Sequence, residues 1–181
     1  MNKTVIIIPT RLAAQRLPNK PLKLINNKEM IVHVYEAAIK SNVGEVLVAT
    51  PDQLIAETIK KIGGKAVITK ENHETGTDRV FEVFSNFLKK EPEVIINLQG
   101  DMPNINSQII SNLVDHTKKN ECDIATLASD FSSESEKEDH NVVKVAVKNK
   151  FLNNSFLNAI DFFRTGKKID NVYHHIGIYG F

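Results

Sequence analysis

Residues 4–9 read TVIIIP, a short apolar run in which most side chains are β-branched. A run of this length between polar residues is typical of a strand that is buried on both faces of a sheet. It is far shorter than the roughly 20 apolar residues that span a bilayer, and shorter than the apolar core of a secretion signal. We therefore interpret it as a buried strand and expect no membrane partner.

Similar runs recur along the chain, and helical patterns separate most of them. The predicted strands are 4–9, 45–50, 65–69, 94–98, 123–128 and 142–147. The predicted helices are 30–41, 52–62, 77–90 and 107–119, and the apolar stripe of the third helix includes Val80, Phe81 and Phe84. Continuous apolar strands that alternate with helices favour an α/β fold, with a mostly parallel sheet covered on both faces.

Length and composition are those of a globular protein. The 181 residues fit one domain, 1–181, because domains usually hold about 100–200 residues. The chain is 41% hydrophobic and 25% charged, which excludes a disordered tail, a fibre and a coiled-coil rod. Its net charge of +1 and the lack of a basic block predict no nucleic-acid partner. The single cysteine, Cys122, excludes an intramolecular disulfide and fits a reducing cytoplasm.

Arginine is scarce in this chain, with four residues against 19 lysines: Arg11, Arg16, Arg79 and Arg164. Such positions can mark sites that need a planar, permanently charged fork. Two of them lie with Lys20 in the segment 9–22, which contains no glycine and is therefore neither a Walker A loop nor a dinucleotide-binding loop. Three cations on one loop suit a polyphosphate ligand, although a solvated basic loop explains them equally well.

Other polar segments also follow predicted strands, where open α/β sheets bind ligands. Residues 97–103 read NLQGDMP, and Asp101 is a candidate Mg²⁺ ligand, with a simple turn as the alternative. Residues 72–79 read NHETGTDR, which either presents hydroxyls and Arg79 to a nucleotide or only caps the next helix. Lys144, in an apolar strand, is expected to reach solvent or an anion.

The last third of the chain is less regular. Residues 131–141 read FSSESEKEDHN, which predicts an exposed loop. The pattern of residues 151–164 is ambiguous. Residues 173–181 read YHHIGIYGF and predict a final strand.

The chain resembles the 3-deoxy-manno-octulosonate (KDO) cytidylyltransferase family, the CMP-KDO synthetases, along essentially its whole length. The segments that carry the resemblance are PTRLAAQRLPNKPL, INNKEMIVHVYE, VLVAT, NHETGTDR, INLQGDMP, IATLA, HNVVKV, AIDFFR and HHIGIYGF. The resemblance implies a three-layer, Rossmann-like fold of the nucleotide-diphospho-sugar transferase type. It also implies a cytoplasmic transferase that uses Mg²⁺ to convert CTP and KDO into CMP-KDO and pyrophosphate for lipopolysaccharide biosynthesis, with a homodimer as a possible assembly.

The family motifs imply roles for individual residues. Arg11, Lys20 and Asp101 are the implied catalytic residues, and Asp101 is also the implied Mg²⁺ ligand. The implied nucleotide-binding residues are Pro9, Thr10, Arg11, Arg16, Lys20, Thr75, Gly76, Arg79 and Gln99. Those implied for the sugar are Gln99, Arg164, His175 and Tyr179.

The sequence departs from the family pattern at several positions. Thr10 stands where the family usually has alanine, Met102 where it has glutamate, and His174 where it has arginine. Residues 165–168 replace a proline-rich continuation. The family also continues past residue 181 with a second metal aspartate and a sugar-binding segment. One alternative is therefore a truncated, catalytically impaired remnant that binds nucleotide weakly, and another is a cytidylyltransferase for sialic acid or methylerythritol phosphate.

Overall fold

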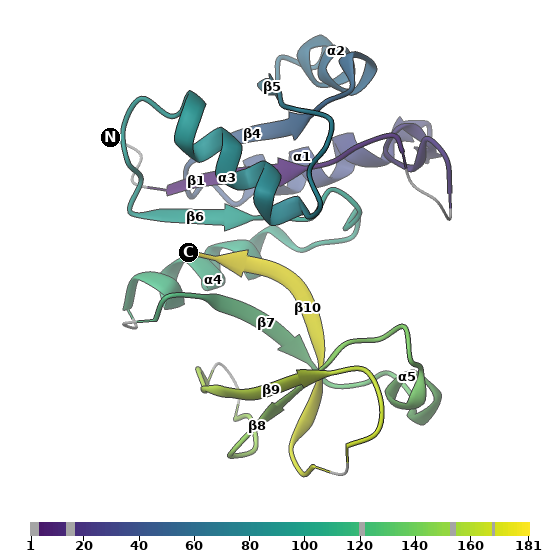
Figure 1. The fold of residues 1–181 in the computed structure, drawn as a ribbon, viewed down its shortest axis with the longest axis vertical. Coiled ribbons are helices and arrows are strands. Elements are labelled where there is room, and N and C mark those ends of the chain that lie inside the picture. Colours follow the sequence, from purple (N-terminus) through teal and green to yellow (C-terminus); the bar gives the residue numbers. More distant parts are fainter. Residues whose placement is uncertain (1–3, 14–16, 120–121, 153–154, 168) are drawn as a thin grey trace. The chain divides into compact units, whose positions relative to one another are not determined.

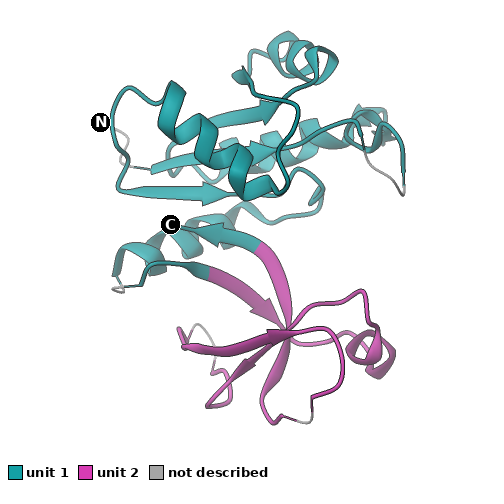
Figure 2. Cartoon of the chain, viewed as in Figure 1, with its two compact units in different colours: residues 1–125, 178–181 teal, residues 126–177 magenta. Residues whose placement is uncertain are grey.

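The computed structural model describes residues 4–13, 17–119, 122–152, 155–167 and 169–181. It divides into two compact units (Figure 2). Unit 1 comprises Met1–Ala125 and Ile178–Phe181, and unit 2 comprises Thr126–Gly177. The last strand, β10 (Val172–Gly180), begins in unit 2 and ends in unit 1. The single domain predicted over residues 1–181 stays a prediction.

The core of unit 1 is a mostly parallel sheet. Its strands lie in the order β5 (Ala66–Ile68), β4 (Glu45–Thr50), β1 (Thr4–Pro9) and β6 (Val94–Asn97), and all of these pair in parallel. The end of β10 joins β6 antiparallel, with Tyr179 opposite Asn97. Every residue of β1 is buried, as its continuous apolar run predicts. The predicted mixed, mostly parallel sheet is therefore confirmed.

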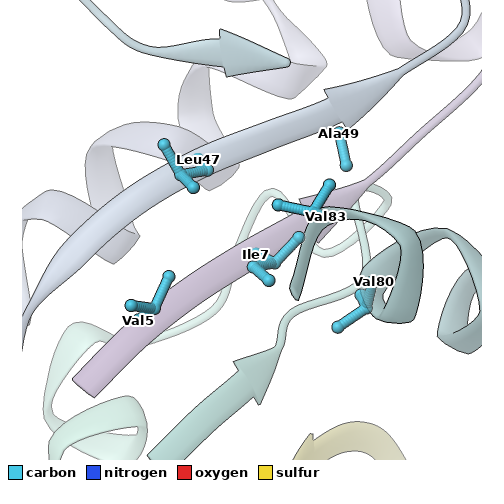
Figure 3. Close-up of a cluster of buried hydrophobic side chains, with 6 residues drawn as sticks. All are labelled: Val5, Ile7, Leu47, Ala49, Val80 and Val83. Carbon is cyan, nitrogen blue, oxygen red and sulfur yellow. The ribbon is translucent and has the colours of Figure 1, made fainter. Parts of the chain in front are cut away.

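Helices cover both faces of this sheet. They are α1 (Met30–Lys40), α2 (Gln53–Lys61), α3 (Gly76–Phe87) and α4 (Ser107–Lys119), close to the predicted bounds. Val80 and Val83 of α3 pack on Val5, Ile7, Leu47 and Ala49 of β1 and β4 (Figure 3). Figure 1 shows α1 on the opposite side of the sheet from α3. The three predicted layers are thus present.

A short hairpin leads from β1 into α1. It consists of β2 (Leu24–Ile25) and β3 (Lys28–Glu29), and it follows a 3₁₀ helix, η1 (Lys20–Leu22). Asn26 and Asn27 form its turn with φ angles of 49° and 62°, a left-handed conformation that asparagine tolerates well. Helix η1 lies next to α1.

Unit 2 is an antiparallel arrangement. It holds most of β7 (Ala125–Ser129), together with α5 (Glu134–Glu138), β8 (Lys144–Val147), β9 (Ala159–Phe163) and the first part of β10. Strand β8 lies between β9 and β10, with Val145 opposite both Phe162 and Tyr173. Val145 and Tyr173 form a small core with Val147. The ring of Phe151 meets Tyr173 edge-on at 4.7 Å.

Two expectations for local structure are corrected. Residues 131–141 are not only a loop, because they contain α5, whose N-cap Ser133 accepts a hydrogen bond from the Glu136 amide at 3.2 Å. The apolar stripe predicted for α3 is also wrong in part, since Phe81 is 64% exposed. Val83 and Arg79 face inward instead. The ambiguous residues 151–164 contain strand β9.

Lys144 reaches neither solvent nor an anion, contrary to expectation. Its side chain is buried, and Nζ donates to the carbonyls of Asp139 at 2.5 Å, Val142 at 3.0 Å and Arg164 at 2.7 Å. Three main-chain acceptors thus hold one buried ammonium group. In this position Lys144 ties the chain before β8 to the chain after β9.

Candidate active site

The carboxyl ends of β1 and β6 and the start of α3 line a cleft of about 260 Å³ in unit 1. Among the residues described, the cleft is lined by Pro9, Thr10, Arg11, Lys20, Pro21, Met30, His73, Glu74, Thr75, Gly76, Arg79, Gln99, Gly100 and Asp101. Ligands of open α/β sheets bind at this edge. The cleft gathers every predicted nucleotide-binding residue except Arg16, which lies outside the described residues.

Backbone contacts hold the chain after β1 against its neighbours. The Thr10 amide donates to the Ala49 carbonyl at 3.0 Å, and the Leu12 amide donates to Asp52 Oδ2 at 2.8 Å. Further on, the Asn19 amide donates to the Leu12 carbonyl at 3.3 Å, just before Lys20 begins η1. Both ends of this loop are therefore anchored, and Arg11 and Lys20 line the same cleft.

The end of β6 is fixed by a short chain of amide hydrogen bonds. Gln99 Nε2 donates to Asn97 Oδ1 at 3.2 Å, and Asn97 Nδ2 donates to Thr77 Oγ1 at 3.2 Å. Asn97 is fully buried, so these bonds satisfy an amide that is removed from water. They join Gln99 to the first turn of α3.

Gly100 marks a close approach between the ends of β6 and β1. A Cβ atom at this position would lie 2.9 Å from Thr10 Cβ and 3.0 Å from the Pro9 carbonyl oxygen. Both distances are too short for a side chain. The absence of a Cβ therefore lets Asp101 follow directly at the edge of the cleft.

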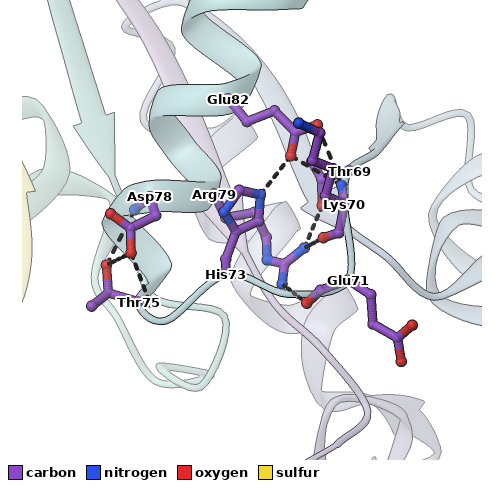
Figure 4. A network of polar contacts seen from close by, with 8 residues as sticks. All are labelled: Thr69, Lys70, Glu71, His73, Thr75, Asp78, Arg79 and Glu82. Atoms are coloured by element: carbon purple, nitrogen blue, oxygen red, sulfur yellow. Dashed lines mark hydrogen bonds and ion pairs between the residues drawn. The ribbon is translucent and has the colours of Figure 1, made fainter.

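The first turn of α3 is held by a reciprocal cap (Figure 4). The Thr75 amide and hydroxyl donate to Asp78 Oδ2 at 2.9 and 2.8 Å, and the Asp78 amide donates to Thr75 Oγ1 at 3.2 Å. These hydrogen bonds from the Thr75 side chain and backbone lower the pKa of the Asp78 carboxyl below its ordinary value. The capping interpretation of residues 72–79 is confirmed. The capped helix start still lines the cleft, and helix starts favour anions.

Charged side chains of both signs line the cleft: Arg11, Lys20 and Arg79 are cations, and Glu74 and Asp101 are carboxylates. Lys20 Nζ donates to Asp101 Oδ2 at 2.9 Å, and both side chains are exposed to solvent. Arg11 is exposed, and its side chain makes no hydrogen bond or ion pair with any other described residue. Exposed ion pairs contribute only about 0–1 kcal/mol, so Lys20 can exchange Asp101 for a phosphate oxygen at little cost.

Asp101 fits the expected Mg²⁺ in donor type. Mg²⁺ is usually held by one or two carboxylates, with phosphate oxygens and water completing its shell. No cluster of three or more His, Cys, Asp or Glu side chains suited to a metal occurs among the described residues. The Asp101 carboxylate suits an ion that shares its ligands with a bound phosphate.

Arg79 lines the cleft but is 3% exposed, and its guanidinium bonds to the protein itself. Nη1 donates to Thr69 Oγ1 and to the Lys70 carbonyl at 2.8 Å, and Nη2 donates to the Glu71 carbonyl at 3.3 Å. Burial, with a smaller contribution from Arg11, lowers the pKa of Arg79 below its ordinary value. Its predicted contact with a nucleotide stays a prediction.

The residues predicted for the sugar are divided between the units. Gln99 and Tyr179 belong to unit 1, whereas Arg164 and His175 belong to unit 2. Arg164 Nη1 donates to the Asn141 carbonyl at 2.6 Å. His175 Nε2 lies 2.9 Å from Thr126 Oγ1, and burial lowers the pKa of its imidazole. Burial also raises the pKa of the Tyr179 hydroxyl.

Several cleft residues were missed by the sequence-based prediction. They are Pro21, Met30, His73 and Glu74. His73 and Glu74 belong to the same NHETGTDR segment as Thr75, so their position after a predicted strand was an available signal. Nothing local marks Met30, which begins α1 and reaches the cleft only through the tertiary fold.

A family profile for cytidylyltransferases matches residues 5–181. The chain belongs to the cytidylyltransferase family. Among curated proteins it is 38% identical to a 3-deoxy-manno-octulosonate cytidylyltransferase of Brucella anthropi, over 99% of this chain and 73% of that protein. It is also 38% identical to the enzyme of the same name from Thermodesulfovibrio yellowstonii, over 98% of this chain and 74% of that protein. The resemblance stated from the sequence motifs is thus confirmed.

Two solved structures share the fold of this chain. One is CMP:2-keto-3-deoxy-manno-octonic acid synthetase complexed with CTP, with a TM-score of 0.86 and 36% identity over 98% of this chain and 73% of that chain. A 4-diphosphocytidyl-2C-methyl-D-erythritol synthase from Anaerococcus prevotii reaches a TM-score of 0.59 at 14% identity, which shows a shared fold alone. Across the described residues, no helix combines the length and the apolar character that crossing a membrane requires.

Proposed function

We propose that this chain is a KDO cytidylyltransferase, which transfers CMP from CTP to KDO and releases pyrophosphate. The observation that carries the proposal is the cleft, where Arg11, Lys20 and Asp101 line one site with the start of α3. That arrangement suits a nucleoside triphosphate with its metal ion. The family and the names of its relatives indicate which substrates to propose, a cytidine nucleotide and the sugar acid KDO.

In the proposed reaction, the anomeric hydroxyl oxygen of KDO attacks the α-phosphorus of CTP. A new O–P bond forms while the bond from the α-phosphorus to the pyrophosphate oxygen breaks, and the hydroxyl proton leaves to water. Negative charge grows on the phosphate oxygens, and phosphoryl-type transfers are catalysed mainly by positioning and by stabilising such charge. Arg11 would bind near the α-phosphate, and Lys20 would bind the triphosphate and stabilise the departing pyrophosphate.

The other side chains of the cleft would orient the substrates. Thr75 and Gly76 would line the nucleotide site at the start of α3, and Gln99, fixed by Asn97, would face the base or the sugar. Asp101 would hold Mg²⁺, which when bound would neutralise phosphate charge. Arg164, His175 and Tyr179 keep their proposed roles toward KDO on the strength of the family resemblance. A cytoplasmic location and a homodimer are part of the same proposal.

The direct test is pyrophosphate release by the purified chain with CTP, KDO and Mg²⁺. We expect release that depends on KDO and that falls at least about 100-fold in Asp101→Asn, because the variant would hold Mg²⁺ poorly and lose the charge stabilisation that the ion would supply. Asp115→Asn is the matched control, since Asp115 is an exposed carboxylate on α4 away from the cleft residues. Release with sialic acid or methylerythritol phosphate, but not with KDO, would overturn the choice of sugar. No release with any of the three would overturn the function.

A further inference from the structure

One wall of the cleft is a segment without regular structure. Residues 69–75, here called the cleft segment, connect β5 to α3, and three of them line the cleft: His73, Glu74 and Thr75. A loop that forms part of a binding site must be held by contacts from rigid elements if the site is to keep its shape. Figure 4 shows where those contacts come from.

Glu82 holds the middle of the cleft segment from the second turn of α3. Its Oε2 lies 2.5 Å from His73 Nε2 and accepts from the Lys70 amide at 3.0 Å. The side chains of His73 and Glu82 are only 13% and 10% exposed. Burial on its own would raise the pKa of Glu82, but the hydrogen bonds from His73 and Lys70 hold it below its ordinary value. The carboxylate is therefore ionised at neutral pH and acts as an acceptor.

Arg79 holds the beginning of the same segment, one helical turn before Glu82. Its guanidinium donates to Thr69 Oγ1 and to the carbonyls of Lys70 and Glu71. The Lys70 peptide is thus held from both sides, its amide by Glu82 and its carbonyl by Arg79. The Thr75 cap fixes the far end of the segment. Helix α3 in turn packs on β1 and β4 through Val80 and Val83.

We propose that Glu82 is a positioning residue for nucleotide binding, which acts through His73 and the Lys70 amide to hold the cleft segment against the nucleotide. The carboxylate does not itself belong to the residues that line the cleft. The inference rests on the proposed function for the identity of the nucleotide. The contacts of Glu82 with the cleft segment form without any ligand.

Removing Glu82 would leave the partly buried His73 Nε2 and the Lys70 amide without their acceptor, which is costly unless the segment moves to let water replace it. The segment would then sample positions other than the one that fits the nucleotide. Binding would weaken in proportion to the lost population of the fitting position. Chemistry on nucleotide already bound would be affected much less, because Arg11, Lys20 and Asp101 come from other segments.

The experiment compares Glu82→Ala, Glu82→Gln and the unchanged full chain. Hydrogen exchange of the 69–75 amides is measured without nucleotide, the CTP dissociation constant by calorimetry, and kcat and KM by pyrophosphate release. Glu82→Ala should exchange these amides about tenfold faster and raise both the CTP dissociation constant and KM about tenfold, with kcat within twofold. Glu82→Gln should restore most of the affinity, because its amide oxygen can accept both hydrogen bonds. Glu57→Ala, which removes an exposed glutamate of α2, is the control.

Different results would contradict different parts of the proposal. An unchanged exchange rate in Glu82→Ala would overturn the positioning of the segment, whatever the nucleotide. A loss of kcat at unchanged KM would show a smaller fraction of folded enzyme, and would also overturn the proposal. A glutamine variant as weak as the alanine variant would contradict the hydrogen-bond argument. An unchanged full chain that fails to bind CTP would instead overturn the proposed function, together with the nucleotide role of Glu82.

Discussion

The two compact units use their cations in different ways. In unit 1, Arg11 and Lys20 are anchored by their backbone, and their side chains line the cleft, with an exposed aspartate as the partner of Lys20. In unit 2, Lys144 and Arg164 donate to main-chain carbonyls. A cation that is bound to carbonyls stabilises the fold, whereas a cation that the fold leaves exposed at a cleft is available for a ligand.

The sheet topology explains this difference. Parallel strands all end at one edge, so the loops after β1 and β6 bring polar side chains together there. The antiparallel strands β8 and β9 of unit 2 end at opposite edges, and their connections need donors for unpaired carbonyls. Arg79 lies in unit 1 and still donates to carbonyls. The role of a cation therefore depends on its contacts rather than on the unit that holds it.

The largest predicted effect is the loss of a cation at the cleft. We expect Lys20→Ala to lower kcat by about 100- to 1000-fold, because a charge that stabilises the transition state is removed. Its melting temperature should stay nearly unchanged, since the exposed ion pair with Asp101 contributes little to stability. Pyrophosphate release and a thermal melt measure the two effects. Lys23→Ala, an exposed lysine just after η1, is the control. A large loss of stability in Lys20→Ala would mean that this cation, too, is structural.

For the buried Lys144 of unit 2 we expect a loss of stability rather than a loss at the active site. Lys144→Met keeps the apolar stem and removes the ammonium group that three carbonyls share. Hydrogen bonds to a charged group contribute about 1.5–3 kcal/mol each, and water can replace part of them because the three carbonyls are only partly buried. We therefore expect a loss of about 3 kcal/mol in the free energy of unfolding. Urea denaturation measures it, with Lys148→Met at an exposed position as the control. An unchanged stability with weaker CTP binding would show that Lys144 serves nucleotide binding rather than stability.

Much of the fold and of the candidate site is predictable from local patterns. The strand at residues 4–9 has the predicted bounds because its apolar run ends at Pro9 and polar residues follow. The cleft residues Arg11, Lys20, Thr75, Gln99 and Asp101 all follow predicted strands, and parallel topology brings such positions together.

The remaining features depend on tertiary contacts that no local pattern contains. Phe81 belongs to the predicted apolar stripe of its helix, yet the face that packs on the sheet carries Val80 and Val83, and Phe81 is exposed. The scarcity of arginine singles out Arg79, but no local pattern predicts its hydrogen bonds to Thr69 Oγ1 and to the Lys70 and Glu71 carbonyls. Its contact with a nucleotide stays a prediction. The acceptors of Lys144 are likewise defined only once β8 and β9 pair.

The smallest predicted effect concerns a buried titratable group in unit 2, His175. Burial, and then the nearby His174, lower its pKa below the value of about 6.5 that an unfolded chain has. The unfolded state therefore binds more protons as pH falls below about 6.5, and the free energy of unfolding decreases with falling pH in that window. We expect His175→Gln to reduce the drop in melting temperature between pH 7.5 and 5.5 by roughly two degrees. Thermal melts at both pH values test this, with His116→Gln on α4 as the control variant. A pH dependence that is the same in the His175 variant would show that other groups cause it, and would contradict a lowered pKa of His175.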